Sequence, residues 1–303
     1  MELMDGASAT RPSMAGAESK RIYRLEVSEG PTGIGDPDAP NMAVVVDVET
    51  TGLDRNRDVI IELAMRQFRY DDEGRITNIG RPFCWLQDPG RPLTEEIMKL
   101  TGLNDEMLTG QAIDKVLAAR ILRRADLVVA HNASFDRPRV EDVILDGVGA
   151  AWACSCNEID WRGFGFDGRS LGYLLAQIGY YNGAHRASAD VDSTIALLAH
   201  EVAPGRTAMA ELVERSERDT WIVRANGAAY EAKNALKLRG YRWDADARIW
   251  WREVADRADE EVWLAANIYA PTANAVALGA EWLQITNRHR WNPAPQRKKN
   301  VPI

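Results

Sequence analysis

The amino-acid sequence predicts an α/β fold, in which helices flank a mixed β-sheet and a small α+β domain follows. AVVVDV, at 43–48, is a continuous apolar run rich in valine, which is typical of a strand buried on both faces. Beyond residue 94, segments of helical periodicity alternate with short apolar runs, and this pattern indicates helices on the faces of a sheet. At 303 residues, the chain is long enough for about two domains.

The first predicted elements are strands that pair in antiparallel order. VIIELAMRQFRY follows the valine-rich run at hairpin distance, and ITNIGRPFCWLQ alternates in the manner of an edge strand. DLVVAHN, at 126–132, has the length and composition of a further short buried strand. The sheet is therefore predicted to begin with antiparallel strands.

Five helices are predicted around this sheet. Cap residues, acidic first turns or terminal glycines set their ends, and apolar residues recur at spacings of three and four in their interiors. The segments are TEEIMKLTG (94–102), DKVLAARILRRA (114–125), FDRPRVEDVILDG (135–147), GRSLGYLLAQIG (168–179) and ADVDSTIALLAHEVA (189–203).

After APGRT, at 203–207, the pattern changes to that of a small α+β domain. Its predicted elements are a strand in WIVRA, a helix in YEAKNALKLRG, a hairpin in YRWDADARIWWREV, a helix in DEEVWLAANIYA and a strand in EWLQITNRH. We assign residues 42–203 to the first domain and 207–292 to the second. Residues 1–41, which contain the Pro- and Gly-rich PTGIGDPDAP, are expected to form a disordered tail and linker, and 293–303 a flexible tail.

The net charge of −8 argues against a protein that coats nucleic acid through general electrostatics. From Thr207 onward, however, 15 Lys and Arg stand against 13 Asp and Glu, so the excess of acid lies in the first domain. The apolar runs are too short to cross a bilayer, and the first twenty residues lack the apolar core of a signal peptide. We therefore expect a cytoplasmic protein, free to associate with the nucleoid, that does not bind membranes.

Several acidic residues of the first domain lie where predicted elements begin or end. Asp47 and Glu49 are two apart at the end of a strand, so their side chains leave on the same face. Asp136 follows the strand DLVVAHN, and Asp190 opens a helix with His185 five residues upstream. Converging carboxylates are typical Mg²⁺ ligands, and a neutral imidazole can accept a proton from water near physiological pH. The pattern predicts a metal site with a general base.

The segments that carry these residues, DVETTGL, HNASFD and HRASAD, resemble the three exonuclease motifs of the DEDDh family. This superfamily includes the bacterial epsilon proofreading subunit, RNase T and oligoribonuclease. The resemblance covers residues 42–202, and IMKLTGLNDEML is similar to the family's segment beside the active site. It implies an RNase H-like fold with a mixed five-stranded sheet, and a phosphodiester hydrolase that uses two divalent cations, Mg²⁺ or Mn²⁺. The tyrosine branch of the superfamily has Tyr at the position of Arg186.

The resemblance also implies a role for each motif residue. Asp47 would bridge both metals, while Glu49 and Asp190 would hold the metal that activates water. Asp136 would serve the other metal, directly or through water, and His185 would be the general base.

Further residues of the motifs are candidate contacts for the 3′-terminal nucleotide. The hydroxyls of Thr50 and Thr51 and the backbone around Gly52 are expected to touch it. Leu53 would pack under its base, and Asn132 in the second motif is a further candidate.

The predicted reaction is 3′→5′ removal of nucleoside 5′-monophosphates, with single-stranded DNA or frayed 3′ ends as the leading substrate, in DNA repair or proofreading-like trimming. An exoribonuclease acting on RNA 3′ ends or short oligoribonucleotides would use the same five residues, because pocket shape discriminates the 2′-hydroxyl. The alternative from another class is a nucleic-acid-binding accessory that acts through the C-terminal domain. The intact catalytic set favours the enzyme. We expect nucleic acid as a partner, and a polymerase or repair protein as another.

Tryptophans and cations are concentrated in the second predicted domain. Aromatic faces beside cations are how many proteins grip single strands, although a small domain also needs large side chains for its core. Trp250 and Trp251 are adjacent in a predicted strand and therefore point to opposite faces. We expect at least half of these tryptophans in the core, and select Trp251 as a candidate for stacking on a base.

Overall fold

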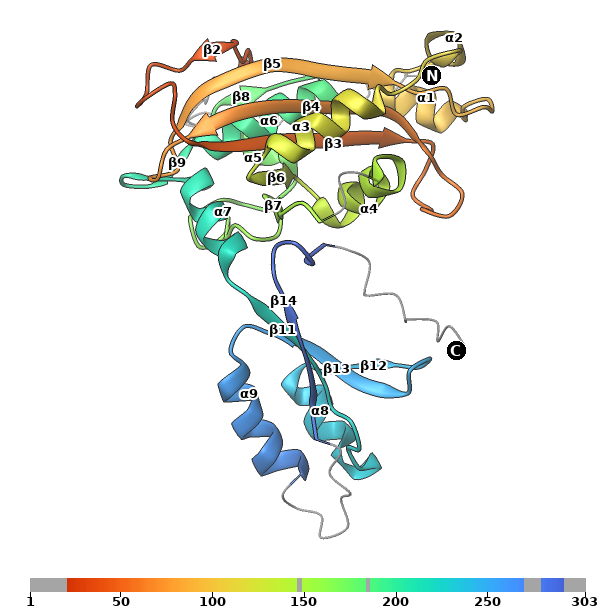
Figure 1. The fold of residues 1–303 in the computed structure, drawn as a ribbon, viewed down its shortest axis with the longest axis vertical. Coiled ribbons are helices and arrows are strands. Elements are labelled where there is room, and N and C mark those ends of the chain that lie inside the picture. The colour runs from red at the N-terminus through yellow and green to blue at the C-terminus, as the bar shows by residue number, and fades with distance from the viewer. Residues whose placement is uncertain (1–20, 146–148, 184–185, 270–278, 292–303) are drawn as a thin grey trace, which may run out of the picture.

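The computed structural model describes residues 21–145, 149–183, 186–269 and 279–291. Among these residues, a six-stranded and a four-stranded β-sheet, each with its own helices, form a larger unit at the top of Figure 1 and a smaller one below it, and two further sheets have two strands each. This arrangement confirms the predicted fold class, a mixed α/β sheet followed by a small α+β unit.

The larger sheet has six strands in the order β2-β5-β4-β3-β6-β7, one more than the five expected, because the two-residue β2 joins the β5 edge. β3 pairs antiparallel with β4 and parallel with β6, and this makes the sheet mixed, as predicted. β7 extends the parallel side, whereas β2 adds two residues at the opposite edge. The bounds are β2 (Gly30–Pro31), β3 (Asn41–Thr50), β4 (Ile60–Tyr70), β5 (Ile76–Leu86), β6 (Leu127–Ala130) and β7 (Trp152–Cys154).

Helices cover both faces of this sheet, and β3 is buried between them. Val44 and Val46 pack into the core under α3 and α4, while Val45 faces the core under α5, α6 and α7. Figure 1 shows α3 in front of the sheet and α6 behind it. The bounds are α1 (Glu95–Thr101), α2 (Asp105–Leu108), α3 (Lys115–Arg124), α4 (Ala133–Val143), α5 (Leu171–Gln177), α6 (Ala187–Ala199) and α7 (Ala208–Glu217).

Residues 21–41 differ from the expected disordered tail and linker. β1 (Tyr23–Arg24) pairs with β8 (Tyr180–Tyr181), and β2 pairs with the edge strand β5. An edge strand leaves backbone N–H and C=O groups unpaired, so an extended segment can bind it even when it is rich in Pro and Gly. Composition alone therefore misassigned this segment.

The smaller sheet is antiparallel, with strands in the order β12-β13-β11-β14. α8 (Lys233–Arg239) and α9 (Arg257–Leu264), with a π-helical turn at Ala265–Tyr269, supply buried residues to the core on one face of this sheet. A 3₁₀ turn, Tyr230–Ala232, precedes α8. The strands are β11 (Thr220–Arg224), β12 (Arg242–Asp244), β13 (Ile249–Val254) and β14 (Glu281–Ile285).

The predicted boundary between the two domains differs from the structure. A hairpin of β9 (Glu201–Ala203) and β10 (Arg206–Thr207) leads into α7, whose residues Ala208, Met209 and Leu212 belong to the core of the larger unit. The smaller sheet starts only at β11. The apolar face of α7 therefore ties 208–217 to the first unit rather than to the second.

The chain after β14 returns to the larger unit, where two buried arginines hold it. The Arg137 guanidinium donates to the carbonyls of Arg288 (2.6 Å) and Arg290 (2.5 Å) and pairs with Glu141. The Arg290 guanidinium pairs with Glu158 at 2.5 Å. The position of residues 286–291 is thus fixed by charged groups inside the first unit.

Among the described residues, no helix is both long and apolar enough to span a membrane.

We predict that Arg137→Ala lowers the free energy of unfolding by about 3–5 kcal/mol, because it leaves the Glu141 carboxylate buried and unpaired. Urea denaturation followed by tryptophan fluorescence measures this loss. The matched control is Arg75→Ala, which removes exposed ion pairs with Asp71 and Glu73 and should cost less than about 1 kcal/mol. Equal losses in the two variants would contradict the stabilising role of the buried Arg137–Glu141 pair.

Candidate active site

Three of the predicted carboxylates meet at the carboxyl end of β3. Asp47 and Glu49 leave this strand on one face, and Asp190 comes from the first turn of α6. Ligand oxygens of Asp47, Glu49 and Asp190 all lie within 4.8 Å of one another. The contact of α6 with β3 and β4 therefore brings together residues that are more than 140 positions apart.

The fourth predicted carboxylate, Asp136, lies behind this group in the first turn of α4. It is only 3% exposed, and its Oδ1 accepts a hydrogen bond from the Val48 amide at 3.2 Å. Val48 lies between Asp47 and Glu49 in β3, so this hydrogen bond fixes Asp136 to the part of the strand that carries both residues. Its charge also raises the pKa of Asp47.

The electrostatics of this group favour the protonated forms. Burial raises the pKa of Asp47 well above its usual range, and the neighbouring carboxylates, Asp136 first, raise it further. Burial raises the pKa of Glu49 to about 7, and the charge of Asp190 adds to this shift. Burial also raises the pKa of Asp136 to about 7, against the opposing hydrogen bond from the Val48 amide. The structure thus concentrates negative charge that a bound cation would neutralise.

These residues fit a hard divalent cation. Carboxylate oxygens are the ligands that Mg²⁺ and Mn²⁺ prefer, and the three clustered side chains offer them at mutual distances suited to one ion. The two arginines whose charges lower the pKa of Glu49 and Asp136 form their hydrogen bonds with other groups. Arg186 binds Glu62, and Arg139 donates to the carbonyls of Phe135 and Leu53.

Glu62 is part of the site although the sequence analysis did not select it. It lies in β4 directly opposite Glu49 and is fully buried. Its carboxylate accepts hydrogen bonds from Arg186 Nη2 at 2.8 Å and from the Ala187 amide at 3.0 Å. Burial opposes its ionisation, but these hydrogen bonds outweigh burial and lower the pKa of Glu62. Glu62 therefore anchors the start of α6, the helix that carries Asp190.

A sequence signal for Glu62 did exist. It stands within VIIELAM, a run of otherwise apolar residues in a predicted strand. A charged residue at such a position is buried with a partner in most proteins. The identity of the partner, 124 residues away, was not visible in the sequence.

The loop after β3 is held by its own hydrogen bonds and by α4. Thr50 Oγ1 donates to the Gly52 carbonyl at 2.6 Å, and Thr51 Oγ1 donates to Asp58 at 3.0 Å. A Cβ on Gly52 would lie 2.5 Å from Asp58 Oδ2, so glycine is needed there to admit this carboxylate. Leu53 is 84% exposed, and its carbonyl accepts from Arg139 at 2.7 Å. Among these candidates, Leu53 thus presents the open apolar surface that contact with a base requires.

The remaining candidates lie in different places. Asn132 is exposed at the N-terminus of α4, where its side-chain oxygen accepts a hydrogen bond from Ser134. Trp251 lies in β13 of the smaller sheet, where the Arg242 guanidinium is 5.9 Å from its ring centre. His185 lies outside the described residues, so its predicted role as general base stays a prediction.

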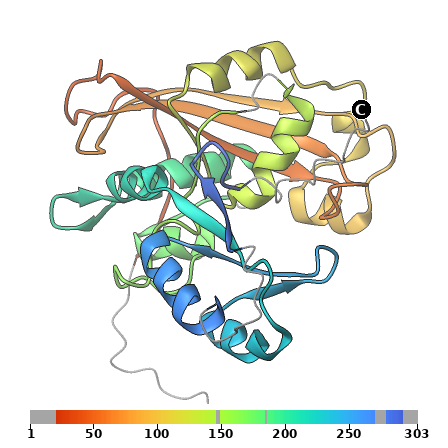
Figure 2. The ribbon, with the colours of Figure 1, turned by 60° about the horizontal axis from the view of Figure 1, so that its bottom comes forward.

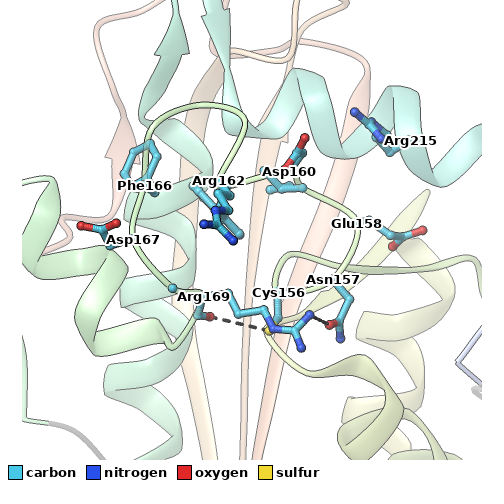
Figure 3. A pocket seen from close by; sticks show the side chains of 12 residues that line it. Cys156, Asn157, Glu158, Asp160, Arg162, Phe166, Asp167, Arg169 and Arg215 are labelled. Atoms are coloured by element: carbon cyan, nitrogen blue, oxygen red, sulfur yellow. Dashed lines mark hydrogen bonds between the residues drawn. The ribbon is translucent and has the colours of Figure 1, made fainter.

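A cavity of about 750 Å³ lies beside the site, in the loop after β7. Figure 3 shows Arg162 and Arg169 among its lining side chains, with Arg169 bound to Asn157. None of the four carboxylates lines this cavity. His131, directly after β6, contacts Ser155 and the Arg169 carbonyl. Burial lowers the pKa of His131 to about 4, which agrees with a structural role for a neutral ring.

Comparisons with known proteins place the site in a family. The exonuclease family RNase_T matches residues 44–198, half of the chain, and this range contains all four carboxylates. The chain is 40% identical to the PolC-type DNA polymerase III of Bacillus subtilis over 129 residues, which are 39% of this chain and 8% of that protein. The corresponding enzyme of Listeria innocua is 45% identical over 94 residues, 30% of this chain and 6% of that protein. The chain therefore spans less than a tenth of these relatives.

Two exonucleases are among the solved structures to which this chain is similar in part. Exonuclease X in complex with 5′ overhanging duplex DNA is 25% identical, with a TM-score of 0.42 over 57% of this chain and 99% of that chain. E. coli exonuclease I in complex with a dA16 oligonucleotide is 14% identical, with a TM-score of 0.48 over 82% of this chain and 64% of that one. The family match runs from Val44 in β3 through β7, α4 and α6, and so includes the carboxylates that these elements carry. This chain therefore carries the domain of a nucleic-acid hydrolase and belongs to the RNase_T exonuclease family, as its three motifs indicated.

Proposed function

We propose that this protein is a metal-dependent 3′→5′ exonuclease that removes nucleoside 5′-monophosphates from single-stranded DNA. The observation that carries the proposal is the group of ligand oxygens from Asp47, Glu49 and Asp190, all within 4.8 Å of one another. Asp136, buried directly behind them, supplies the fourth acidic residue of the motifs.

The residues present divide the work between binding and proton transfer. Asp47, Glu49 and Asp190 would hold one divalent cation, and Asp136 would hold a second one together with Asp47. Two cations, Mg²⁺ or Mn²⁺, would supply positive charge for the phosphoryl oxygens and lower the pKa of a bound water. His185, one residue before the Arg186 that Glu62 holds, would accept the proton of the attacking water.

The loop 50–53 would receive the terminal nucleotide. Its internal hydrogen bonds and its attachment to Arg139 limit its freedom, which lowers the entropic cost of holding a nucleotide in place. The exposed Leu53 side chain would contact the base, a contact that does not depend on base identity. DNA as substrate is supported by relatives named as DNA polymerases, and a polymerase is the partner that this likeness suggests.

The test is a time course with 5′-labelled DNA and RNA oligonucleotides, single- and double-stranded, in Mg²⁺, Mn²⁺ or EDTA. We expect single-stranded DNA to shorten from its 3′ end in either metal and to stay intact in EDTA. Asp47→Asn should slow cleavage about a thousandfold or more, since the metals contribute several kcal/mol of charge stabilisation. The control Glu96→Gln, an exposed carboxylate in α1, should leave the rate unchanged. Preferential shortening of RNA would replace the DNA assignment, and cleavage that survives Asp47→Asn would overturn the site.

The raised pKa values predict how stability without metal depends on pH. Glu49 and Asp136 have pKa values of about 7 in the folded chain, above the usual values near 4. Their contribution to stability is complete below about pH 4 and is lost as the pH rises through 7. The melting temperature in EDTA should therefore fall between pH 5 and 8.

Metal should reverse this loss. At pH 8, Mg²⁺ at a hundredfold excess over its dissociation constant should restore about 2.7 kcal/mol. Asp136→Asn should flatten the pH dependence in EDTA, because it removes one of the titrating groups. Thermal melts across the pH range test both statements. A melting temperature at pH 8 that Mg²⁺ leaves unchanged would contradict the first, and equal slopes for wild type and Asp136→Asn would contradict the second.

Glu62 is predicted to act as a positioning residue through Arg186. Glu62→Gln keeps the volume of the side chain but weakens its hold on the start of α6. We expect a loss of about 10–100-fold in metal affinity or activity, the usual size of effect for a group that orients metal ligands. Cleavage rates measured against Mg²⁺ concentration should show a raised half-saturating concentration. A rate curve that matches wild type in a folded protein would remove Glu62 from this role.

A further inference from the structure

The smaller unit contains a cavity of about 580 Å³ that none of the predicted site residues lines. It lies between the β12–β13 hairpin, the start of α8 and the loop after β11. Its lining includes small residues at 225–229, which leave room for a ligand. We call this cavity the hairpin pocket, and define it by the larger side chains that line it, Tyr230, Lys233, Lys237, Trp243, Arg248 and Trp250.

The hairpin pocket is positively charged. Three cations line it, and none of the described lining residues is acidic. Within the described part of the chain, Lys237 and Arg248 pair with no carboxylate, whereas Arg239 and Arg252 of the same unit both bind Glu260. Asp246, two residues before Arg248, is exposed. Asp244, the next carboxylate in sequence, accepts hydrogen bonds from the Asp246 and Ala247 amides within the turn. Lys237 and Arg248 are both exposed, so their charge faces solvent.

The pocket also offers exposed aromatic rings. Trp243 is 50% exposed and Tyr230 is 75% exposed. Trp243 rests on Trp250, which packs against the core of the smaller unit, with ring centres 5.3 Å apart. Lys233 Nζ lies 4.1 Å from the centre of the Tyr230 ring. The Trp243 ring thus packs against Trp250 and is half exposed to solvent, beside the lysine and arginine side chains of the pocket.

The hairpin turn holds Arg248 at the pocket. Arg248 has a φ of 53°, in the left-handed region that non-glycine residues rarely adopt. Such a conformation costs energy and persists where the surrounding structure imposes it. Here the turn between β12 and β13 places a cation on the same cavity as Trp243.

We propose that the hairpin pocket binds single-stranded nucleic acid, with a base stacked on Trp243 and the adjoining phosphates on Lys233, Lys237 and Arg248. Stacking rings beside cations suit this ligand because every base has a π-face and every nucleotide a charge. The proposal deepens the proposed function, since it assigns a second contact to the same substrate. In Figures 1 and 2, the hairpin tip and the carboxyl end of β3 point to the same side of the molecule, so one strand can run from one to the other.

The structure separates this pocket from the tryptophan that the sequence suggested. Trp251 pairs with Arg242 and Arg224 across the sheet, and alternation places its side chain on the face opposite to Trp250. Trp243 stands opposite Trp250 in the register and shares its face. Trp251→Ala is therefore compared with Trp243→Ala, since the two rings belong to the same sheet but lie on opposite faces.

Binding is measured by fluorescence anisotropy with 5′-fluorescein-dT20, using the full chain with Asp47→Asn to prevent cleavage. Trp243→Ala should weaken binding about 5- to 150-fold, the cost of one lost base stack. Lys237→Gln combined with Arg248→Gln should weaken binding and reduce the slope of log affinity against log salt by about 1.4, for two lost phosphate contacts. A larger loss of affinity in Trp251→Ala than in Trp243→Ala would place the stacking ring on the opposite face of the sheet and overturn the hairpin pocket. Near-UV circular dichroism checks that every variant is folded.

Cleavage distinguishes failure of the pocket from failure of the proposed function. With Asp47 intact, Trp243→Ala should raise the KM for dT20 but leave cleavage of the dinucleotide pdTpdT unchanged, because a dinucleotide occupies only the active site. Absence of cleavage by wild type would refute the exonuclease while leaving the anisotropy test in force. Unchanged dT20 affinity in folded Trp243→Ala and in the double cation variant overturns the pocket, as does equal competition by polyglutamate, which carries charge but no bases.

Discussion

Repulsion among clustered, partly buried carboxylates is the constraint on which this structure depends. Asp47, Glu49 and Asp190 are held together although the charges of Asp190 and Glu49 raise the pKa of Asp47, and the charge of Asp190 raises the pKa of Glu49. A flexible chain would let them separate. Here β3 lies in the interior of the sheet with both faces covered, the Val48 amide holds Asp136, and Glu62 holds the start of α6. The covered sheet and these hydrogen bonds thus hold the carboxylates close together.

The same framework connects the active site to the smaller unit. Asp136 and Arg137 are neighbours in α4, and the second binds the backbone of 288–290 after the last strand of the smaller sheet. α4 therefore carries both Asp136, a predicted metal ligand, and the anchor of the C-terminal segment. Arg290 adds a second link, to Glu158 beyond β7. Movement of the smaller unit would have to disturb buried charged contacts, so these contacts favour one orientation of the two units.

Local patterns predicted much of this molecule. The valine-rich strand, the terminal glycines of α1 and α8, and the placement of Asp136 and Asp190 in first helical turns all follow from short-range rules of alternation and capping. The misassigned features depend on contacts between distant segments. Residues 21–41 have a linker composition but pair with a sheet edge, and Glu62 acquires its role from Arg186, 124 residues later. Periodicity gives the type of an element but not its partner.

The carboxylate group of the larger unit and the hairpin pocket of the smaller unit carry opposite charges. An acidic site repels a phosphate backbone until cations are bound, so a strand approaching the larger unit gains little from electrostatics alone. The smaller unit presents Lys237 and Arg248 in a cavity with an exposed tryptophan, and its surface attracts what the first site repels. In the proposed function, capture of the strand at one site and cleavage at the other would require opposite charges, and separate sheets joined by buried arginines allow one chain to hold both.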